Sequence, residues 1–483
     1  MQQRTAFGIE AVIRGLPRVL LAVPLLLALP GLLESALGPG EGETRDPNNE
    51  RIEASYQYLK AHLEAPFEGY GDPPGVSVSG WKIAALSHMA TGLMSMGTAA
   101  SASGDEKRLA EIGSLLEEVA VRATSDDISP YDTPLTEINN YDDWGFYLGH
   151  LSLTLGCARY LSGTTAYDDL HGRVVRYQLA RMTDDGDHHS RSYPNSYKWP
   201  ADQALTLAGA SLYDRIHGTA LAAEPSADWL AEVAAISSEG LHPFALTNPE
   251  ALPINTDGTR LDPMPDSGVP RGSALSPTIF YLAQFAPESA AALYTGYRAQ
   301  RLDSVMGFGG FREWPGEGGS DIEAGPVVGG LGTIATALGL APARLYGDQV
   351  AYSTILRSTL AAGLPSDLGE GRGHLLAPLL GEAILFHGLT ARAWFDPPPS
   401  LSLSTEAPAP TGGWLLLLLD MGLLGLLLRR PIRRLRAHRH AAEDEALAED
   451  EALAEDEALA EDEALAEDEA LAEDEAQALH QLG

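Results

Sequence analysis

Four segments of the sequence are dense in carboxylate, aromatic and amide side chains, the groups that acid–base catalysis and ligand binding use. They are NNYDDWG (139–145), 184–202, 310–326 and the wide connection 243–271. Two carboxyl groups that share one space take different pKa values, so one can donate a proton while the other accepts one. A structural role is the alternative for each acid: Asp202, just inside the start of a predicted helix, favours the helix dipole, and Asp321 can hydrogen-bond loop amides. The candidates for such a pair are Asp143, Asp202, Glu313, Asp321 and Glu323.

Aromatic residues accompany these acids: Trp144, Tyr193, Tyr197, Trp199 and Trp314. Their rings could stack on sugar rings or stabilise a carbocation, or they could simply fill the loops. The neighbouring run 184–189 offers carboxylates and two adjacent histidines, but adjacent histidines lack the i,i+4 spacing of a helical zinc pair. Cys157 is the single cysteine, which excludes an intrachain disulfide and a thiolate zinc cluster. We therefore expect no metal and no other cofactor.

Both ends of the chain carry membrane signals. Arginines precede the apolar stretch 19–33, which predicts a signal peptide or an N-terminal anchor over residues 1–38. A linker at 397–413 leads to the apolar segment 414–428, a predicted transmembrane helix, and then to the arginine cluster 429–440. Arginines that follow an apolar run stay in the cytoplasm. The preceding body is thus expected outside the cytoplasm, on the periplasmic side, anchored to the membrane by the C-terminal helix.

The residues beyond the arginine cluster form an acidic tail at 441–483, built on an EDEALA repeat. A period of six places successive leucines on different faces of a helix, so no coiled-coil stripe results. We expect a solvated, partly helical, cytoplasmic tail. The formal net charge of −35 is only partly due to this tail, and the acidic body would repel phosphates, which excludes nucleic acid as a partner. Asp420 within the predicted span is costly unless it is protonated or paired, which leaves a homo-oligomer open.

The residues between these ends, 50–395, predict an all-α fold. Twelve segments have helical apolar spacing or composition: 52–64, 81–100, 106–123, 141–160, 166–182, 200–217, 226–239, 272–285, 288–302, 325–339, 343–360 and 375–394. Short and long connections alternate strictly between them, which puts every long loop on one face of an antiparallel array. This rhythm predicts an (α/α)6 toroid of six helical hairpins, with the even-numbered segments inside and few strands. Long loops in a compact domain are usually functional, so the site is expected at the mouth where they converge.

Three short patterns resemble the linalool dehydratase-isomerase family. They are Tyr147-x-Gly149-His150-Leu151-x-Leu153, Tyr213-Asp214-Arg215-x-His217-Gly218-Thr219 and Arg312-Glu313, in matching order over about residues 140–345. The resemblance implies an exported (α/α)6 toroid with its active site at the mouth, at a subunit interface. It places His150 on an active-site histidine, where a neutral imidazole holds a substrate hydroxyl or moves its proton. The two cysteines of the family are replaced here by about Tyr193 and by Asp202.

The function that this resemblance implies is that of a membrane-anchored lyase or isomerase of the dehydratase type. It would apply acid–base chemistry to a small alcohol or an isoprenoid-like molecule. Two alternatives stay open: a cell-envelope glycan hydrolase or lyase on the same scaffold, and a non-catalytic binding domain. The predicted catalytic residues are His150, Asp202, Tyr193 and Glu313. The predicted substrate-binding residues are Asp143, Trp144, Tyr147, Tyr197, Trp199, Arg312, Trp314 and Asp321.

Overall fold

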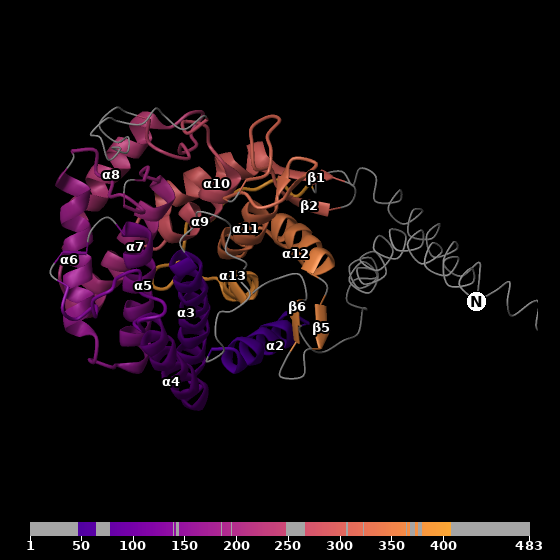
Figure 1. Cartoon of the computed structure of the whole chain (residues 1–483). Coiled ribbons are helices and arrows are strands. Elements are labelled where there is room, and N and C mark those ends of the chain that lie inside the picture. Colours follow the sequence, from indigo (N-terminus) through magenta and orange to yellow (C-terminus); the bar gives the residue numbers. More distant parts are fainter. Residues whose placement is uncertain are drawn as a thin grey trace, which may run out of the picture. The chain divides into compact units, whose positions relative to one another are not determined.

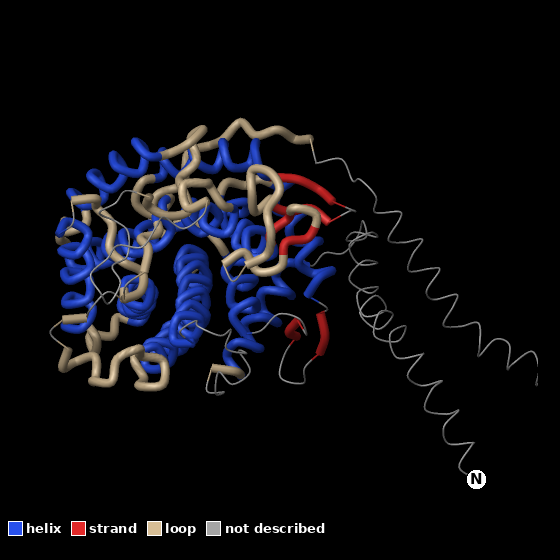
Figure 2. Tube along the Cα trace, turned by 45° about the horizontal axis from the view of Figure 1, so that its top comes forward, coloured by secondary structure: helices blue, strands red, loops and turns tan. Residues whose placement is uncertain are grey.

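The computed structural model describes residues 47–63, 78–138, 140–141, 144–184, 186–194, 196–247, 266–305, 308–321, 323–363, 365–367, 372–374 and 379–406. These residues contain twelve α-helices and three two-stranded antiparallel sheets (Figures 1 and 2). None of the described helices is both long and apolar enough to cross a membrane. The segments predicted as signal or anchor (1–38), transmembrane helix (414–428), arginine cluster (429–440) and acidic tail (441–483) lie outside the described residues, so they stay predictions.

Six helices form a closed inner ring, in which each packs against the next and α13 packs back against α3. They are α3 (Val78–Ser103), α5 (Gly145–Ser162), α7 (Pro200–His217), α9 (Gly272–Leu282), α11 (Thr333–Leu345) and α13 (Leu379–Thr390). Six further helices pack on the outside of this ring (Figure 1). They are α2 (Pro47–Ala61), α4 (Glu106–Ala123), α6 (Asp168–Asp184), α8 (Ala223–Ile236), α10 (Pro287–Arg301) and α12 (Gln349–Gly363). The mostly helical α/α arrangement is therefore confirmed, with the even-numbered predicted segments inside.

Small residues let the inner helices approach closely. A Cβ atom on Gly209 of α7 would lie 3.1 Å from Ser152 Oγ of α5, and one on Gly149 would lie 3.1 Å from Thr206 Oγ1. The outer helices are amphipathic instead. In α4 the buried residues include Ile112, Leu115, Leu116 and Val119, the i, i+3, i+4, i+7 spacing of a single apolar stripe. The two kinds of helix thus occupy the layers that their sequences favour.

The strands correct the predicted helix boundaries. The segment predicted as a helix from residue 325 begins with a hairpin, in which β3 (Val327–Val328) pairs with β4 (Leu331–Gly332). Gly329 and Gly330 take positive φ values of 61° and 90°, a conformation that ends regular helix, so α11 starts at Thr333. The other two sheets pair β1 (Leu302–Val305) with β2 (Phe308–Phe311), and β5 (Pro365–Asp367) with β6 (Arg372–His374). The expectation of few strands is confirmed for the described residues.

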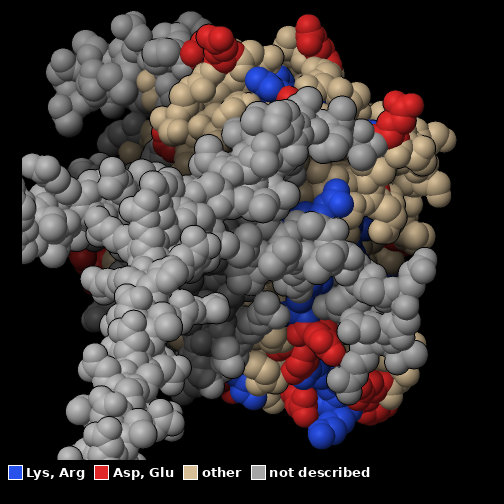
Figure 3. Space-filling view, turned by 90° about the vertical axis from the view of Figure 1, so that its right-hand side faces the viewer, with Lys and Arg blue, Asp and Glu red and all other residues tan. Residues whose placement is uncertain are grey.

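Charged side chains are interleaved on the surface that Figure 3 colours, where Asp and Glu lie beside Lys and Arg. Ion pairs account for part of this mixing. Arg108 of α4 pairs with Glu53 of α2 at 2.5 Å, and Arg122 pairs with Asp127 at 2.5 Å. Exposed pairs of this kind contribute about 0–1 kcal/mol each. They therefore help to orient the outer helices but do not determine the fold.

Candidate active site

A pocket of about 580 Å³ lies inside the ring, and each of the six inner helices contributes to its wall. Its size is typical of a small-molecule or oligosaccharide-unit site. The helices supply, among others, Trp81 and His88 (α3), Phe146 and His150 (α5), Asp202 and Leu205 (α7), Pro277 and Tyr281 (α9), Ile334 and Leu338 (α11), and Leu380 and Ile384 (α13). Loop residues supply Trp144, Tyr193, Trp199, Phe244 and Glu323. The pocket therefore lies where the predicted toroid mouth should hold the site.

A chain of aromatic rings forms one wall of the pocket. The ring of Tyr193 lies 5.9 Å from Trp144, 5.5 Å from Phe146 and 6.2 Å from Trp199, centroid to centroid. Trp199 in turn lies 6.2 Å from Phe244. The indole Nε1 of Trp199 is buried and has no hydrogen-bond partner among the described residues. The wall thus combines flat apolar faces with one donor that a ligand could use.

The loop that carries Tyr193 is fastened between the starts of α5 and α7. The amides of Gly145 and Phe146 donate to the carbonyls of Arg191 and Ser192, both at 3.0 Å. A Cβ atom on Gly145 would lie 2.4 Å from the Arg191 carbonyl oxygen, so this close approach requires glycine. On the other side, the amide of Ser190 donates to Gln203 Oε1 at 3.1 Å. The aromatic wall is therefore held by backbone contacts as well as by packing.

The acidic, histidine-bearing run 184–189 supports this loop. Asp187 accepts from the buried Lys198 ammonium at 2.8 Å, and its carbonyl lies 2.7 Å from His189 Nδ1. The indole of Trp229 donates to His189 Nε2 at 3.0 Å. Within the described part of the chain, no group of three or more His, Cys, Asp or Glu residues could hold a metal ion. The polar groups of Asp187 and His189 are thus engaged in holding the fold.

Asp202 stands in the first turn of α7, half-buried in the pocket wall. Burial raises the pKa of its carboxyl to about 7; the hydrogen bond from Ser192 Oγ lowers the pKa, and the charge of Glu323 raises it further. A large fraction of Asp202 is consequently protonated at neutral pH. The group has the protonation state that a general acid needs.

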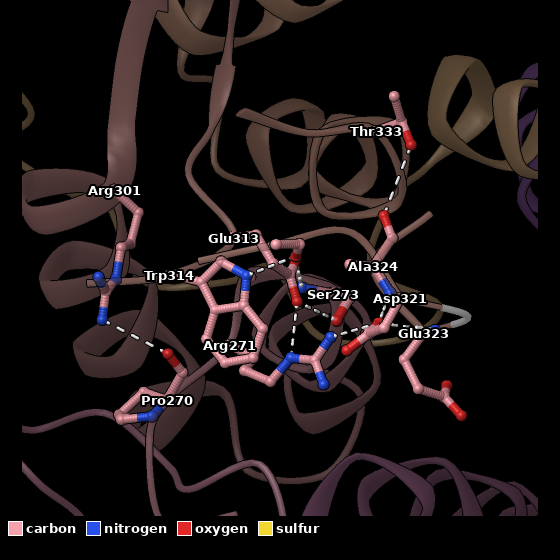
Figure 4. Close-up of polar contacts among 12 residues, drawn as sticks. Pro270, Arg271, Ser273, Arg301, Glu313, Trp314, Asp321, Glu323, Ala324 and Thr333 are labelled. Atoms are coloured by element: carbon pink, nitrogen blue, oxygen red, sulfur yellow. Dashed lines mark hydrogen bonds and ion pairs between the residues drawn. The ribbon is translucent and has the colours of Figure 1, made fainter. Parts of the chain in front are cut away.

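Glu323 provides a second carboxyl group in the same pocket. Glu323 lines the wall, and Figure 4 shows its carboxylate directed away from the neighbouring cluster of charged residues. Desolvation by the surrounding wall raises the pKa of Glu323, and the Arg271 guanidinium counteracts this. Because the charge of Glu323 contributes to the raised pKa of Asp202, the two groups act on each other. Among the four predicted acids that the structure describes, the pair that the pocket brings together is Asp202 and Glu323.

Glu313 lies outside the pocket lining, in a buried cluster around Arg271 (Figure 4). Its carboxylate is fully buried and accepts from Arg271 Nε at 2.9 Å and from the Ser273 amide at 2.9 Å. Asp321 accepts from Arg271 at 2.8 Å, and the guanidinium carbon lies 4.4 Å from the Trp314 ring. The expected convergence of Glu313 and Trp314 with Asp202 in one pocket is thus not found. Arg271 gathers Glu313, Trp314 and Asp321 into a structural cluster behind the wall.

Other predicted binding residues also lie away from the pocket. Tyr147 is buried in the core and donates to the Ala123 carbonyl at 3.2 Å. Arg312 pairs with Asp303 at 2.7 Å, and Tyr197 packs 6.4 Å from Trp199 without lining the pocket. Asp143 lies outside the described residues. Of the predicted site residues, those that line the pocket are Trp144, His150, Tyr193, Trp199 and Asp202.

His150 is buried in the second turn of α5 and lines the pocket, with its ring 4.5 Å from Phe146 and 6.1 Å from His88. Burial, aided by His88, holds the pKa of His150 well below its usual value, so the imidazole is neutral. Its Nδ1 has no partner among the described residues. His88 contacts His387 through their Nδ1 atoms at 3.0 Å. Sequence reasoning missed His88, although Trp81, Ala84 and His88 have the spacing of one helix face.

Comparisons with known proteins identify no family for this chain. No family model matches it, and no curated protein matches it. Solved structures with some similarity include an α-1,6-mannanase of Salegentibacter sp. HEL1_6, 12% identical with a TM-score of 0.43, covering 71% of this chain and 99% of the mannanase. A polysaccharide lyase is 14% identical with a TM-score of 0.41, covering 71% of this chain and 97% of the lyase. A protein of Listeria innocua is 12% identical with a TM-score of 0.44, covering 71% and 96%. Similarity this low identifies no activity.

The predicted membership of the linalool dehydratase-isomerase family is wrong. No family model supports it, and the similar structures named above are of other kinds. The Tyr213–Thr219 pattern, which carried much of the resemblance, has a structural role here. Asp214 accepts from the amides of Leu221 and Ala222 at 2.9 and 2.8 Å, so it fastens the connection to α8. The predicted dehydratase-type activity on a small alcohol or an isoprenoid-like substrate, which depended on this family, is therefore also wrong.

Proposed function

We propose that the pocket is the active site of an enzyme that cleaves glycosidic bonds, with Asp202 as proton donor and Glu323 as proton acceptor. The observation that supports this most is that two carboxyl groups face one pocket with aromatic walls. The faces of sugar rings are apolar enough to stack on Trp144, Tyr193 and Trp199, while carboxyls bond sugar hydroxyls. The pKa of Asp202, raised to about 7, keeps much of that carboxyl protonated at neutral pH, which assigns Asp202 as the acid and leaves Glu323 as the base. This proposal is the alternative function that the sequence left open, a glycan hydrolase or lyase.

The proposed chemistry assigns one proton transfer to each carboxyl group. Asp202 gives its proton to the glycosidic oxygen as the bond from that oxygen to carbon breaks. Glu323 takes a proton, either from a water that attacks the anomeric carbon, giving hydrolysis, or from a ring carbon, giving elimination. In both cases Asp202 ends ionised and Glu323 ends protonated, and exchange with solvent restores the starting state.

The full-length chain incubated with a panel of neutral and acidic glycans tests this proposal. α-1,6-Linked mannan belongs on the panel, because one similar structure holds an α-1,6-mannotetrose. Product oligosaccharides are measured by chromatography for the parent, Asp202→Asn and Glu323→Gln, with Glu317→Gln as a matched control on an exposed loop position. We expect cleavage of at least one glycan, lost about 10²-fold or more in each pocket variant and kept in the control. Cleavage that survives in Asp202→Asn would refute the assignment, and binding without cleavage would favour a non-catalytic domain.

We also propose that this domain works outside the cytoplasm, held to the membrane by residues 414–428. The support is the arginine cluster that follows the apolar run. A cell-envelope glycan would then be within reach.

A further inference from the structure

The charges that line the pocket are all of one kind. Asp202 and Glu323 are the acidic residues of the wall, and no Lys or Arg stands among the described residues that line it. An anionic ligand would therefore meet the charge of Glu323, and that of Asp202 where it is ionised, without a cation in the wall to pair with. Like charges at close range in a partly dry site disfavour binding strongly.

The nearest arginine described behind the wall is already neutralised. Arg271 is 3% exposed, and its Nε and NH2 atoms bond Glu313 at 2.9 Å and Asp321 at 2.8 Å. Its guanidinium carbon lies 4.1 Å from the Phe244 ring and 4.4 Å from the Trp314 ring. Such an arginine stabilises the loop that carries Glu323, and its charge is balanced by two carboxylates of the protein rather than left for a substrate carboxylate.

The polar atoms left for a ligand are uncharged. They are Nδ1 of His150, a neutral imidazole, Nε1 of Trp199 and the hydroxyl of Tyr281, all buried, all on pocket-lining residues and all without a partner in the part of the chain that is described. A buried donor or acceptor without a partner costs free energy, and a ligand hydroxyl would remove that cost. Three neutral polar groups beside aromatic faces suit a sugar with hydroxyl groups only.

We infer that the sugar unit held in this pocket is uncharged rather than a uronic acid, and that the reaction is therefore hydrolysis. This inference rests on the proposed function. Elimination takes a proton from the carbon beside a uronate carboxylate and breaks the bond to the leaving oxygen, forming a carbon–carbon double bond. Negative charge develops on the carboxylate during that step and needs a cation or equivalent donors. Hydrolysis needs none, since Asp202 protonates the leaving oxygen and Glu323 deprotonates the attacking water.

Two tetrasaccharide panels test the inference: neutral gluco-, manno-, galacto- and xylotetraose against tetramers of galacturonate, mannuronate, guluronate and glucuronate. Binding to full-length Asp202→Asn is followed by tryptophan fluorescence, since three tryptophans line the pocket. We expect at least one neutral tetramer to bind tenfold or more tightly than every uronate tetramer. The ratio of their dissociation constants should decrease when Glu323→Gln is added, because this substitution removes a negative charge from the pocket. Products of the parent enzyme should carry a new reducing end and no ultraviolet-absorbing double bond.

Two failures are distinguishable in this experiment. Uronates that bind as tightly as the neutral sugars, or an unsaturated product, would overturn the inference while leaving glycan cleavage by Asp202 and Glu323 intact. If no tetramer of either panel binds or is cleaved, the proposed function fails, and the inference fails with it.

Discussion

Replacing Asp202 by Asn should stabilise the protein at pH 8 while it abolishes activity. In the folded chain the pKa of Asp202 is about 7, against an ordinary value of 3.8. Below pH 3.8 the carboxyl is protonated in both the folded and the unfolded chain, so it does not affect their balance. As the pH rises from 3.8 to about 7, the unfolded chain ionises Asp202 while the folded chain keeps it protonated, and stability is lost. Asn does not titrate, so the variant escapes this loss.

The magnitude follows from the two pKa values. Each pKa unit corresponds to about 1.4 kcal/mol, so the full effect is at most about 4 kcal/mol, reduced to roughly 2–4 kcal/mol by solvent in the pocket. A domain of about 350 residues has an unfolding entropy of about 0.7 kcal/mol/K, which converts this to a gain of about 3–6 °C in Tm. The gain should be near zero below pH 4, should grow up to about pH 7 and should then stay constant.

Thermal unfolding of the two proteins by circular dichroism, at closely spaced pH values between 3.5 and 9, measures this difference. Asp187→Asn is the matched control, because it replaces an acid that pairs with the buried Lys198 at 2.8 Å. Removing the charge that pairs with that buried ammonium should cost about 3–5 kcal/mol, with the opposite sign at pH 8. An Asp202→Asn variant with a gain that does not depend on pH, or that is less stable than the parent at pH 8, would refute the argument that Asp202 is held protonated.

Three further outcomes are expected. Glu313→Gln, which removes the charge that pairs with the buried Arg271, should lower the free energy of unfolding in urea by about 3–5 kcal/mol. Arg312→Gln, which breaks the more exposed pair with Asp303, should lower it by under about 1 kcal/mol. Equal losses in the two variants would contradict the buried cluster. His150→Ala should weaken binding of a neutral tetramer by about tenfold and lower the free energy of unfolding by about 1–3 kcal/mol, since the side chain is buried; unchanged binding would remove it from the site. Protease added to spheroplasts should digest residues 50–395 and spare the tail at 441–483, and the reverse pattern would refute the proposed orientation.

The arrangement of the helices could be predicted because loop length carries topological information. Short and long connections that alternate without exception place alternate helices on the same layer, and the inner ring follows from that. The start of α11 could not be predicted this way. The segment 325–332 has apolar residues at helical spacing, but Gly329 and Gly330 accept positive φ values that most residues avoid. The hairpin there also pairs with residues before it, through the bridge from Arg312 to Leu331, and such contacts leave no local signal.

The candidate site was predicted in part, and the error concerns which of two acids in one loop faces the pocket. Glu313 and Glu323 stand ten positions apart in similar surroundings of glycine and aromatic residues. The two side chains differ in position because of Arg271, the last residue of the wide connection 243–271. Arg271 donates hydrogen bonds to both Glu313 and Asp321. The sequence shows the acids but does not show which cation pairs with two of them and so keeps them out of the pocket. Glu323 is left to face the pocket because its neighbours are used.

The failure of the family resemblance has a related physical cause. The Tyr213–Thr219 pattern ends α7 with Gly218 in the left-handed conformation, φ 66°, and with a carboxylate that collects the amides of the next turn. Any helix that must end there and turn directly into a neighbour is served by this solution, whatever reaction the fold supports. A pattern that fulfils such a local need can recur in toroids with unrelated chemistry. The function is therefore better sought in groups whose surroundings work against folding: a carboxyl held protonated in Asp202, and the unpartnered polar atoms of His150 and Trp199.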